Sequence, residues 1–599
     1  MNKKDFIEFF ISKHEDTITR ILRIFIILSS ISIVGVMIYK FGFNHSKENL
    51  EVLNGITRFF YIVFIINFLV RWILNGRERK FVKQNIFEFL LLLVIVYDGL
   101  INLIFGHPFL ESFFLARNVV NYRSIYHFFI QFFLLVLVAV EFIKSVNSIY
   151  TLRLKPTTLF IFSFVFLILA GGGLLTLPGF NYTGKSLNFI DALFTSASAG
   201  CVTGLTVVNT ATFFNIKGQL VILFLIQLGG IGILTFASFF ASFIKKGLSV
   251  RQNIAMNELL DAENISGSYF LIKRILVMTF AIEALGAIGI YILWGDYPFA
   301  SDGEKIYASI FHSISAFCNA GFSTLEFNFE TPLATELYML HIFIGVIIFF
   351  GGLGFPAIRD IFSPLKLRER LREPWKQWKL STKVALYTSL VLLALGTVAF
   401  YYLHVRHLEH IKSPLGKFAA SFFQSVNTRT SGYNSINLGE LSDTTMLISI
   451  FLMFIGASSA STGGGIKTST FVVMLVAIIG TIKGKTNFSL DRRGIAIDLI
   501  YKAFAVVVFS GLFVLTIITL LSLTDPTFSV IKIAYEAVSA FATVGLSTGI
   551  TAQFSDWGKL ILTFSMFVGR VGVITLAYSL SARETDKDFK YAKTHIMIG

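Results

Sequence analysis

The chain has 599 residues, of which 54% are hydrophobic and only 15% are charged, and its mean hydropathy is +0.72. A soluble protein carries nearer a quarter of its residues as charges, so the composition excludes a string of soluble domains and predicts a polytopic membrane protein. The net charge of +15 indicates basic cytoplasmic loops and not a nucleic-acid partner. Two cysteines exclude a disulfide framework, and no Cys/His cluster indicates a metal site.

The N-terminal region holds four apolar segments that are long enough to cross a bilayer. They lie at about 20–40, 56–75, 85–106 and 125–147. We expect the first segment to be a retained span, because no small-residue cleavage site follows it. Since the expected fourth helix, near 117–147, offers only Arg117 and Arg123, a voltage sensor is not indicated, and residues 1–150 are predicted to form a peripheral scaffold of transmembrane helices.

The rest of the chain repeats one pattern four times. Each unit has a long apolar run, a short apolar run that ends in a small-residue loop with glycine, and a second long run interrupted by glycine. The sequence therefore predicts an all-α fold with four such units in a pseudo-fourfold arrangement. The predicted units are 151–258, 259–375, 376–490 with an intramembrane gating loop, and 491–599 with a C-terminal tail.

Basic clusters in the loops predict the orientation. They lie at Arg77–Lys83, Lys245–Arg251, Arg359–Lys383 and Lys483–Arg493. All four fall on one side of the membrane if four leading spans precede four span–loop–span units. The positive-inside rule then places these clusters and both termini in the cytoplasm, so the four glycine loops enter from outside.

The four loops align on one glycine each. They read ASAGCVTGLTV, ISAFCNAGFST, SVNTRTSGYNS and VSAFATVGLST, and they superpose Gly204, Gly321, Gly432 and Gly545 at separations of 117, 111 and 113 residues. A large residue and then a small polar residue follow each glycine. The preceding stretch of about ten residues is too short to span the bilayer, but it suits a re-entrant half-helix.

Four such loops can converge on one axis and replace the hydration shell of a monovalent cation with carbonyl oxygens. Glycine permits the backbone angles that aim successive carbonyls inward, and the half-helices present their partly negative C-terminal ends to the ion. Four loops in register favour a pore over ordinary packing of small residues. The predicted filter residues are Val202, Thr203, Gly204, Asn319, Ala320, Gly321, Thr430, Ser431, Gly432, Thr543, Val544 and Gly545.

The third unit carries ten consecutive small residues in its second run, and four of them are glycine. Such a segment is either an irregular loop inside the protein or a kink at a close-packed interface, and we expect a loop that plugs the pathway. Arg570, at mid-membrane in the fourth unit, is predicted to hold the loop through its carbonyls or hydroxyls. The predicted gating residues are Gly456, Ala457, Ser458, Ser459, Ala460, Ser461, Thr462, Gly463, Gly464, Gly465 and Lys467.

Other residues leave alternatives open. Arg429 either braces the third pore loop from behind or lies at the outer mouth as a surface charge. Glu283, within a first run, either binds a coupling ion or pairs with Arg or Lys. The glycine pairs Gly229-Gly230 and Gly351-Gly352 are expected to give room for the loop or to pack helices closely, with no gating role.

Residues 155–599 resemble the potassium-translocating subunits of the Ktr/Trk/HKT superfamily, most closely its KtrB branch. The phrases that carry this resemblance are CVTGLTV, HSISAFCNAGFST, QSVNTRTSGY, AVSAFATVGLSTGIT, GASSASTGGGIKTST and FVGRVGVITL. The resemblance implies M1–pore–M2 units, a filter glycine in each, and a gate at the loop of the third unit. Because some plant members with serine at the first glycine prefer sodium, Gly204 implies potassium as the ion bound at the filter.

The resemblance further implies a homodimer in the cell membrane that rests on a cytosolic nucleotide-binding ring of the RCK/KTN type, with the tail Tyr591–Gly599 at the subunit interface. No cofactor is expected in the chain. K⁺ is the expected transported ion, with Na⁺ as a candidate coupling or activating ion. The bilayer is the other expected partner, and no nucleic acid is expected.

Two other classes of function remain to be weighed against potassium uptake. A membrane enzyme is not indicated, because the chain has no HExxH, GxSxG or Walker motif. A sodium- or proton-coupled secondary transporter of another small cation or solute is the alternative. Carriers of that kind are often built from inverted repeats, whereas all four loops here enter from the same side, which favours a pore.

Overall fold

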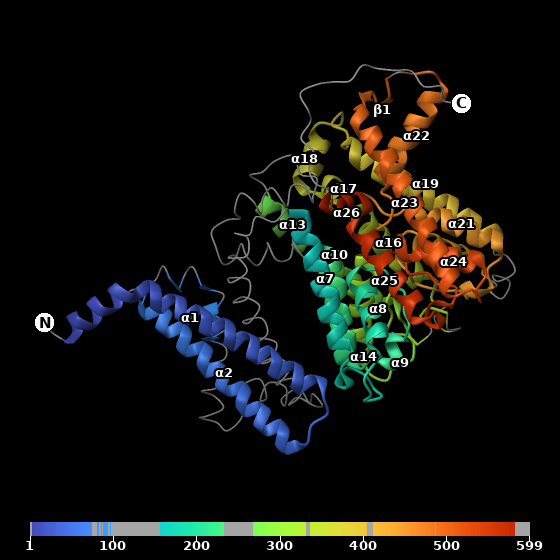
Figure 1. Cartoon of the computed structure of the whole chain (residues 1–599). Coiled ribbons are helices and arrows are strands. Elements are labelled where there is room, and N and C mark those ends of the chain that lie inside the picture. The colour runs from blue at the N-terminus through green and yellow to red at the C-terminus, as the bar shows by residue number, and fades with distance from the viewer. Residues whose placement is uncertain are drawn as a thin grey trace.

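The computed structural model is a helical protein with one two-stranded hairpin in its described part, β1 (Ser489–Leu490) and β2 (Arg493–Gly494) (Figure 1). The structure describes residues 3–74, 81–82, 85–86, 88–90, 92–93, 96–97, 156–232, 268–326, 328–330, 333, 336–403, 411, 413–485 and 487–580. The segment expected at 85–106 is described only in part. The segment expected at 125–147, the basic cluster at Lys245–Arg251 and the tail after 580 lie outside the described residues.

Helices α1 (Lys3–Gly42) and α2 (Lys47–Leu74) form a hairpin that projects from the main body (Figure 1). Both are longer than the expected spans, because their polar ends continue the helix beyond the apolar segment. Ile33 and Phe64 lie in the small core between them, with 0% and 2% of their surfaces exposed. The C-terminal end of α1 contacts the main body, where a Cβ on Gly179 would meet the carbonyl oxygen of Phe41.

The main body contains four sets of helices in the order long, short, long. The first long helices are α7 (Pro156–Leu175), α13 (Ser268–Leu293), α19 (Leu380–Leu403) and α23 (Ile497–Thr524). The short helices, which we call the pore helices, are α8 (Phe189–Gly200), α14 (Asp302–Cys318), α20 (Pro414–Asn427) and α24 (Val530–Phe541). The second long helices begin with α10 (Ile216–Ile231), α16 (Tyr338–Leu353), α21 (Asp443–Phe454) and α25 (Asp556–Val571).

Shorter elements complete this body. Helices α17 (Phe355–Phe362), α22 (Thr468–Ile482) and α26 (Val573–Leu580) continue three of the second helices after a break, and α18 (Pro364–Arg372) follows α17. The outer connections hold η2 (Pro178–Phe180), α9 (Thr210–Phe213), η5 (Leu438–Glu440) and η6 (Thr551–Gln553).

Five described helices are long and apolar enough to cross a membrane, and the bent pair α16 and α17 makes a sixth candidate. The spans are Ile24–Gly42, Lys47–Ile73, Lys273–Leu293, Leu380–Leu403 and Ile497–Thr524. The axis turns by 107° between α16 and α17. This break occurs at Gly354, whose φ of +89° is a backbone conformation that side chains rarely adopt. Glycines with φ of +87° and +89° stand at the same place after α10 and α25.

The four units form a closed ring through one repeated contact. Each second long helix packs against the pore helix of the next unit: α10 against α14, α16 against α20, α21 against α24, and α25 against α8. An ion pair between Lys559 and Asp191, with 2.7 Å between Nζ and Oδ1, joins the fourth unit to the first. The pore helices therefore lie inside the ring, each held between two units.

Three pore helices are fixed to their own first long helix by a serine. The hydroxyls of Ser196, Ser313 and Ser425 donate hydrogen bonds of 2.8, 2.6 and 2.8 Å to the carbonyls of Ile168, Glu283 and Leu393. A glycine of the long helix lies opposite each serine, at Gly171, Gly286 and Gly396, and a Cβ there would meet the serine hydroxyl. This close approach places the start of each pore loop at a defined depth.

The pore helices differ from the expected length of about ten residues in one clear case. Helix α14 has 17 residues, because it begins at the N-cap Ser301, whose hydroxyl accepts from the amide of Glu304. Asp302 and Glu304 in its first turn also favour a helix start at that point. The apolar run in the sequence marks only the buried end of this helix.

Candidate functional site

The residues predicted to form the filter begin within three residues of the ends of the four pore helices. We call 202–204, 319–321, 430–432 and 543–545 the filter strands. In every strand the first and third residues have positive φ and the middle residue does not. The first residues are Val202, Asn319, Thr430 and Thr543, at +59°, +60°, +73° and +50°, and the glycines are at +97°, +69°, +76° and +88°.

This alternation of left-handed and right-handed residues is the feature the four strands share. A regular extended strand directs neighbouring residues to opposite faces, whereas left-handed residues at alternate positions turn successive carbonyl groups toward the same face. A left-handed residue other than glycine costs about 1–2 kcal/mol, so four of them persist only because the surrounding structure imposes them. Strain of this kind is typical of functional backbone.

The four filter glycines form a closed ring. A Cβ on Gly204 would lie 2.5 Å from the carbonyl oxygen of Ala320, and one on Gly321 would lie 2.5 Å from that of Ser431. On Gly432 it would lie 2.8 Å from the oxygen of Val544, and on Gly545 it would meet the oxygen of Thr203. Each glycine thus faces the carbonyl just before the next glycine, in the order of the units. All four predicted filter segments are brought to one axis, and no side chain fits at the glycine positions.

Hydrogen bonds from the pore helices fix the strands. The amides of Thr203, Ala320 and Val544 donate to the carbonyls of Ser198, Ser315 and Ser539 at 2.7, 2.7 and 2.8 Å. The hydroxyls of Ser198 and Ser539 also accept from the amides of Gly204 and Gly545, at 3.0 and 3.1 Å. In the third unit Val426 stands where the other units have this serine, so its strand lacks the hydroxyl support.

Two buried polar side chains brace the outer side of the filter, and the sequence reading did not single them out. Glu536 of α24 has no exposed surface and accepts from the hydroxyls of Ser547 and Thr551 at 2.7 Å each, and from the amide of Thr548 at 2.8 Å. His312 of α14 bonds to the Ser323 hydroxyl at 2.9 Å. Both stand nine residues before a filter glycine and reach the small polar residue two after it. That recurring spacing is the signal that could have found them.

The predicted gating segment is not helical. It lies between α21, which ends at Phe454, and α22, which begins at Thr468, and we call Ile455–Lys467 the intramembrane loop. Ile455 and Ile466 form a parallel bridge at its base, and the amide of Ala457 donates to the carbonyl of Gly464 at 3.3 Å. The left-handed Ala460 turns the chain at its tip.

The loop lies directly against the inner ends of two filter strands. A Cβ on Gly463 would contact the side chain of Thr430, and one on Gly464 would contact that of Thr543. Thr430 and Thr543 are the first residues of the third and fourth filter strands. These two glycines are therefore required by the close approach of the loop to the filter, and the loop covers its inner side.

Backbone hydrogen bonds join the loop to the second unit at the break between α16 and α17. The amides of Ser458 and Thr462 donate to the carbonyls of Gly352 and Gly351 at 3.0 and 3.3 Å, and the amide of Phe355 donates to the carbonyl of Ala460 at 3.1 Å. The glycine pair that we expected only to give room thus supplies two hydrogen-bond acceptors to the loop. Because α16 ends there, its last carbonyls are available to a partner.

Arg570 joins the loop to two further units. Its guanidinium, carried by α25, donates to the carbonyls of Thr462 in the loop and of Gly229 in α10. Arg570 stands in the phrase GRVG, at the position held by the second glycine in GGIG (229–232) and GGLG (351–354). The structure therefore brings Arg570 to the loop carbonyls at the point where two other units have only a glycine.

Lys467 closes the loop on itself. Its ammonium donates to the carbonyl of Gly463 at 2.7 Å. Within the described residues, neither Arg570 nor Lys467 forms an ion pair with an acid. Backbone carbonyls are instead their acceptors, those of Thr462 and Gly463 in the loop and that of Gly229 in α10, so two basic side chains lie beneath the filter strands.

The two residues with open alternatives now have defined surroundings. Arg429 faces inward and donates to the carbonyl of Gly456 in the intramembrane loop at 3.0 Å, so it is not a charge at the outer mouth. Glu283 is 5% exposed and its partner is the amide of Gln227, at 3.1 and 3.2 Å from the two carboxylate oxygens, rather than Arg or Lys.

Arg77 and Lys80 of the first basic cluster lie outside the described residues.

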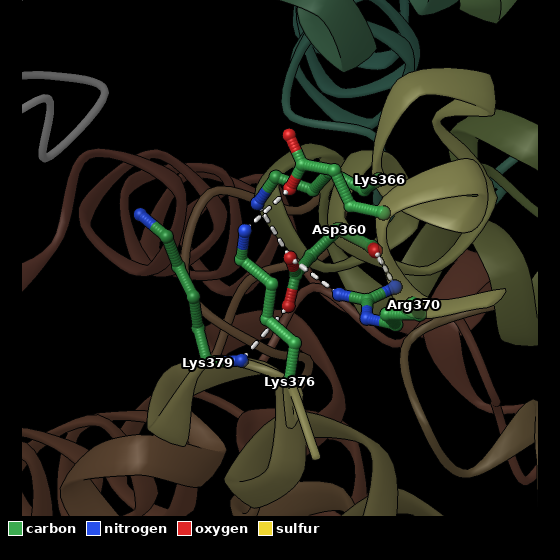
Figure 2. Close-up of polar contacts among 6 residues, drawn as sticks. Asp360, Lys366, Arg370, Lys376 and Lys379 are labelled. Atoms are coloured by element: carbon green, nitrogen blue, oxygen red, sulfur yellow. Dashed lines mark hydrogen bonds and ion pairs between the residues drawn. The ribbon is translucent and has the colours of Figure 1, made fainter. Parts of the chain in front are cut away.

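On the far side of α17, Asp360 organises a basic surface (Figure 2). Its carboxylate accepts from Lys366 at 2.6 Å, from Arg370 at 2.9 Å and from the backbone amide of Lys379 at 2.9 Å. This arrangement fixes α18 against the end of α17. The other basic side chains of the segment Arg359–Lys383 are therefore held in a fixed position. This segment begins a few residues after the break between α16 and α17, which bonds to the loop.

Comparison with known proteins agrees with this geometry. Residues 124–591 match the TrkH family, described as "Cation transport protein". The chain belongs to this family. It is a family of ion transporters and not of enzymes, and the membership expected from the filter motifs is confirmed.

Two curated relatives align over most of their length. The chain is 37% identical over 455 residues to "Potassium/sodium uptake protein NtpJ" of Enterococcus hirae, which covers 75% of this chain and 98% of the relative. It is 36% identical over 457 residues to "Ktr system potassium uptake protein B" of Bacillus subtilis, with 75% and 97% covered.

Among solved structures, the potassium transporter TrkH from Vibrio parahaemolyticus superposes with a TM-score of 0.56 at 17% identity. The match covers 84% of this chain and 99% of that one. At this identity the likeness concerns the fold alone. It confirms the predicted class, an all-α multi-pass membrane protein.

We predict that Glu536→Gln lowers both stability and ion discrimination, because an amide nitrogen cannot accept the hydrogen bonds that one carboxylate oxygen now accepts. The loss of hydrogen bonds to a buried charged group corresponds to about 2 kcal/mol. Thermal unfolding in detergent and competition between K⁺ and Na⁺ in vesicles measure the two effects. Asp296→Asn, at an exposed acid after α13, is the control, and equal behaviour of both variants would contradict the bracing role.

Proposed function

We propose that this chain takes up potassium through a central pore whose filter is formed by the four strands at 202–204, 319–321, 430–432 and 543–545. The observation that carries this proposal is the closed ring, in which each filter glycine faces the carbonyl that precedes the next one. Rings of backbone carbonyls are the means by which proteins replace the hydration shell of a monovalent cation. The two relatives described above are named as uptake proteins for potassium and for potassium and sodium, which supports the same ion.

The surroundings of the filter support a cation over an anion. The pore helices end at the filter, and the C-terminal end of a helix carries a partial negative charge. The filter strands are short, because only three to five residues separate the end of each pore helix from the large residue after the glycine. Each strand therefore offers few carbonyl groups, and we expect the discrimination between K⁺ and Na⁺ to depend on how rigidly the protein holds them.

A coupled transporter is the second candidate, and Glu283 favours it. This buried carboxyl group bonds to Gln227, and no ion pair to it occurs among the described residues. A membrane-embedded acid is by default a candidate for a functional role. Uptake in vesicles with imposed sodium or proton gradients distinguishes the two mechanisms: a passive pore follows the K⁺ gradient alone, whereas a coupled carrier concentrates K⁺ against it.

We predict that Gly204→Ser lowers the preference for K⁺ over Na⁺ by about tenfold, which corresponds to ~1.4 kcal/mol. A side chain at Gly204 would meet the carbonyl of Ala320 and would also sit at a φ of +97°, so the first two filter strands must shift. Competition between K⁺ and Na⁺ for uptake into vesicles measures the preference.

Gly511→Ser is the matched control, because a Cβ at Gly511 has no neighbour within 4 Å. If Gly204→Ser leaves the preference unchanged while Gly321→Ser alters it, the proposed alignment of the first unit is wrong.

We further propose that the intramembrane loop is the gate. The loop lies under the filter strands and is held by carbonyl contacts to Arg570 and to the break after α16, all of which can be exchanged without disturbing the filter. Since these contacts come from separate units, small movements between units change them together. The gating residues and Arg570 thus act as one closed assembly.

Removal of residues 457–464 is predicted to increase K⁺ flux several-fold, because the loop obstructs the pathway and contributes no filter carbonyl. Arg570→Ala is expected to act in the same direction. Flux into vesicles at equal protein content measures both. Reduced flux with normal expression and unchanged selectivity in the loop deletion would contradict the gating role.

We propose that the protein resides in the cell membrane with both termini in the cytoplasm and works as a homodimer with a cytosolic nucleotide-binding subunit. The basic surface around Asp360 supports this partner. A further ion pair on that side, Lys383 with Asp491 at 2.6 Å, ties the start of α19 to the β1–β2 hairpin. Its hydrogen bond from Lys383 holds the pKa of Asp491 below the ordinary value. This surface is thus a fixed docking face for an acidic partner.

Deletion of 591–599 is predicted to weaken the dimer, and transport is expected to respond to ATP only when the ring subunit is added. Mass measurement in detergent and flux in reconstituted vesicles test the two halves. A truncated chain that stays as dimeric as the full one would refute the tail's role. A full nucleotide response from the chain alone would refute the need for a partner.

A further inference from the structure

Arg429 stands at a position where the other three units have a small residue. It lies three residues before the filter glycine Gly432, and the equivalent residues are Cys201, Cys318 and Ala542. All three are fully buried. Only the third unit carries a long cationic side chain there, and the third unit is also the one that carries the intramembrane loop.

The guanidinium reaches the first small residue of that loop. Its Nη2 donates to the carbonyl of Gly456 at 3.0 Å and lies 3.5 Å from the hydroxyl of Ser389 in α19, while Nη1 has no hydrogen-bond partner among the described residues. Within the same residues no acid forms an ion pair with Arg429. A buried charge that lacks a counter-ion is costly, and its main acceptor here is a carbonyl of the loop.

The position of that carbonyl is favourable for a cation. Helix α21 ends at Phe454, and Gly456 follows two residues later. The last carbonyls of a helix lack partners within it and carry partial negative charge, so a cation at this end is stabilised. The contact exists only while Gly456 stays where it is. A loop that moves away removes the acceptor of Arg429.

A small cavity lies beside this contact. Its volume of about 20 Å³ suits about one water molecule, and its lining includes Gly352, Ser389, Val426, Arg429 and Ala457. Ala457 is the loop residue that follows Gly456, and Gly352 accepts a hydrogen bond from the next residue of the loop. The first residues of the loop are therefore closely packed around the Arg429 contact.

We propose that Arg429 is a positioning residue that holds the intramembrane loop closed at its first residue and ties that loop to the third filter strand. This inference rests on the proposed gating function and adds a second arginine to it. Arg570 holds the middle of the loop from the fourth unit, whereas Arg429 holds its start from the filter itself. With Lys467, three basic side chains then donate to loop carbonyls beneath the filter, and the two arginines repel K⁺ while the loop is closed.

The first test measures K⁺ flux in vesicles for Arg429→Gln in two backgrounds, the full chain and the chain without residues 457–464. Loss of a charged hydrogen bond predicts a flux increase of roughly tenfold in the full chain. In the loop-deleted chain the same substitution is expected to have no effect, because Gly456 remains as an acceptor of Arg429 but the obstructing residues that follow it are gone. Arg429→Lys keeps a cationic donor and is expected to restore most of the closed state.

The second test follows the loop without measuring transport. Ala457 is 1% exposed, so in Ala457→Cys a membrane-impermeant maleimide should react slowly. We expect Arg429→Gln to increase that rate several-fold and Ser389→Ala, which removes only the weaker contact, to leave it nearly unchanged. The two native cysteines, Cys201 and Cys318, are free and buried, and the chain without the introduced cysteine gives their background.

Three outcomes would overturn the inference. Reduced flux with lost K⁺ over Na⁺ preference in Arg429→Gln would make Arg429 a brace of the filter alone. An equal flux increase in both backgrounds would show that it does not act through the loop. An unchanged maleimide rate would show that it does not hold Ala457. Failure of the gating proposal is distinguishable, because it appears as unchanged flux in the loop-deleted chain that retains Arg429.

Discussion

The carbonyl groups of the four filter strands are the constraint on which the rest of the structure depends. A backbone that does not satisfy its own hydrogen bonds persists at membrane depth only inside protein or beside water. The pore helices, their serine contacts to the first long helices and the packing of each second helix on the next unit all serve to hold these strands. Glu536 shows how many contacts this support requires. Four hydrogen-bond donors converge on its buried carboxylate and fix the outer end of one strand.

Departures from fourfold symmetry gather around the inner side of the filter. Three units have a small residue where the third has Arg429, and two units have glycine where the fourth has Arg570. Both arginines donate to carbonyls of the intramembrane loop, which replaces a continuous helix in the third unit. A symmetric ring suffices for a filter, but a loop that occupies the axis must be held from particular sides. The asymmetric residues are therefore the ones that hold the intramembrane loop in place.

The loop is also connected to the surface on which a partner can act. It bonds to Gly351, Gly352 and Phe355 at the break after α16, and α17 continues from there to Asp360 and the basic segment that Asp360 organises (Figure 2). One short helix thus separates the loop contacts from the proposed docking face. A partner that moves this segment biases the loop through differential contacts in its two positions, which is the physical requirement for control.

The sequence by itself determined the membrane class, the fourfold pattern, the filter glycines and the small-residue loop, because each depends on local chemistry that leaves a mark in the residues used. Positive φ together with the close approach of a neighbouring carbonyl requires glycine at Gly204 and its equivalents, and a run without bulky apolar side chains cannot face lipid. Only the tertiary structure decided which groups bond to the two arginines and to the glycine pair of α16. Arg429 meets Gly456 and Arg570 meets Gly229 across 27 and 341 residues of chain, and the glycine pair of α16 became an acceptor for the loop only because the ring places it there. Spacing along the chain carries no record of such contacts, since the closure of the four units sets them.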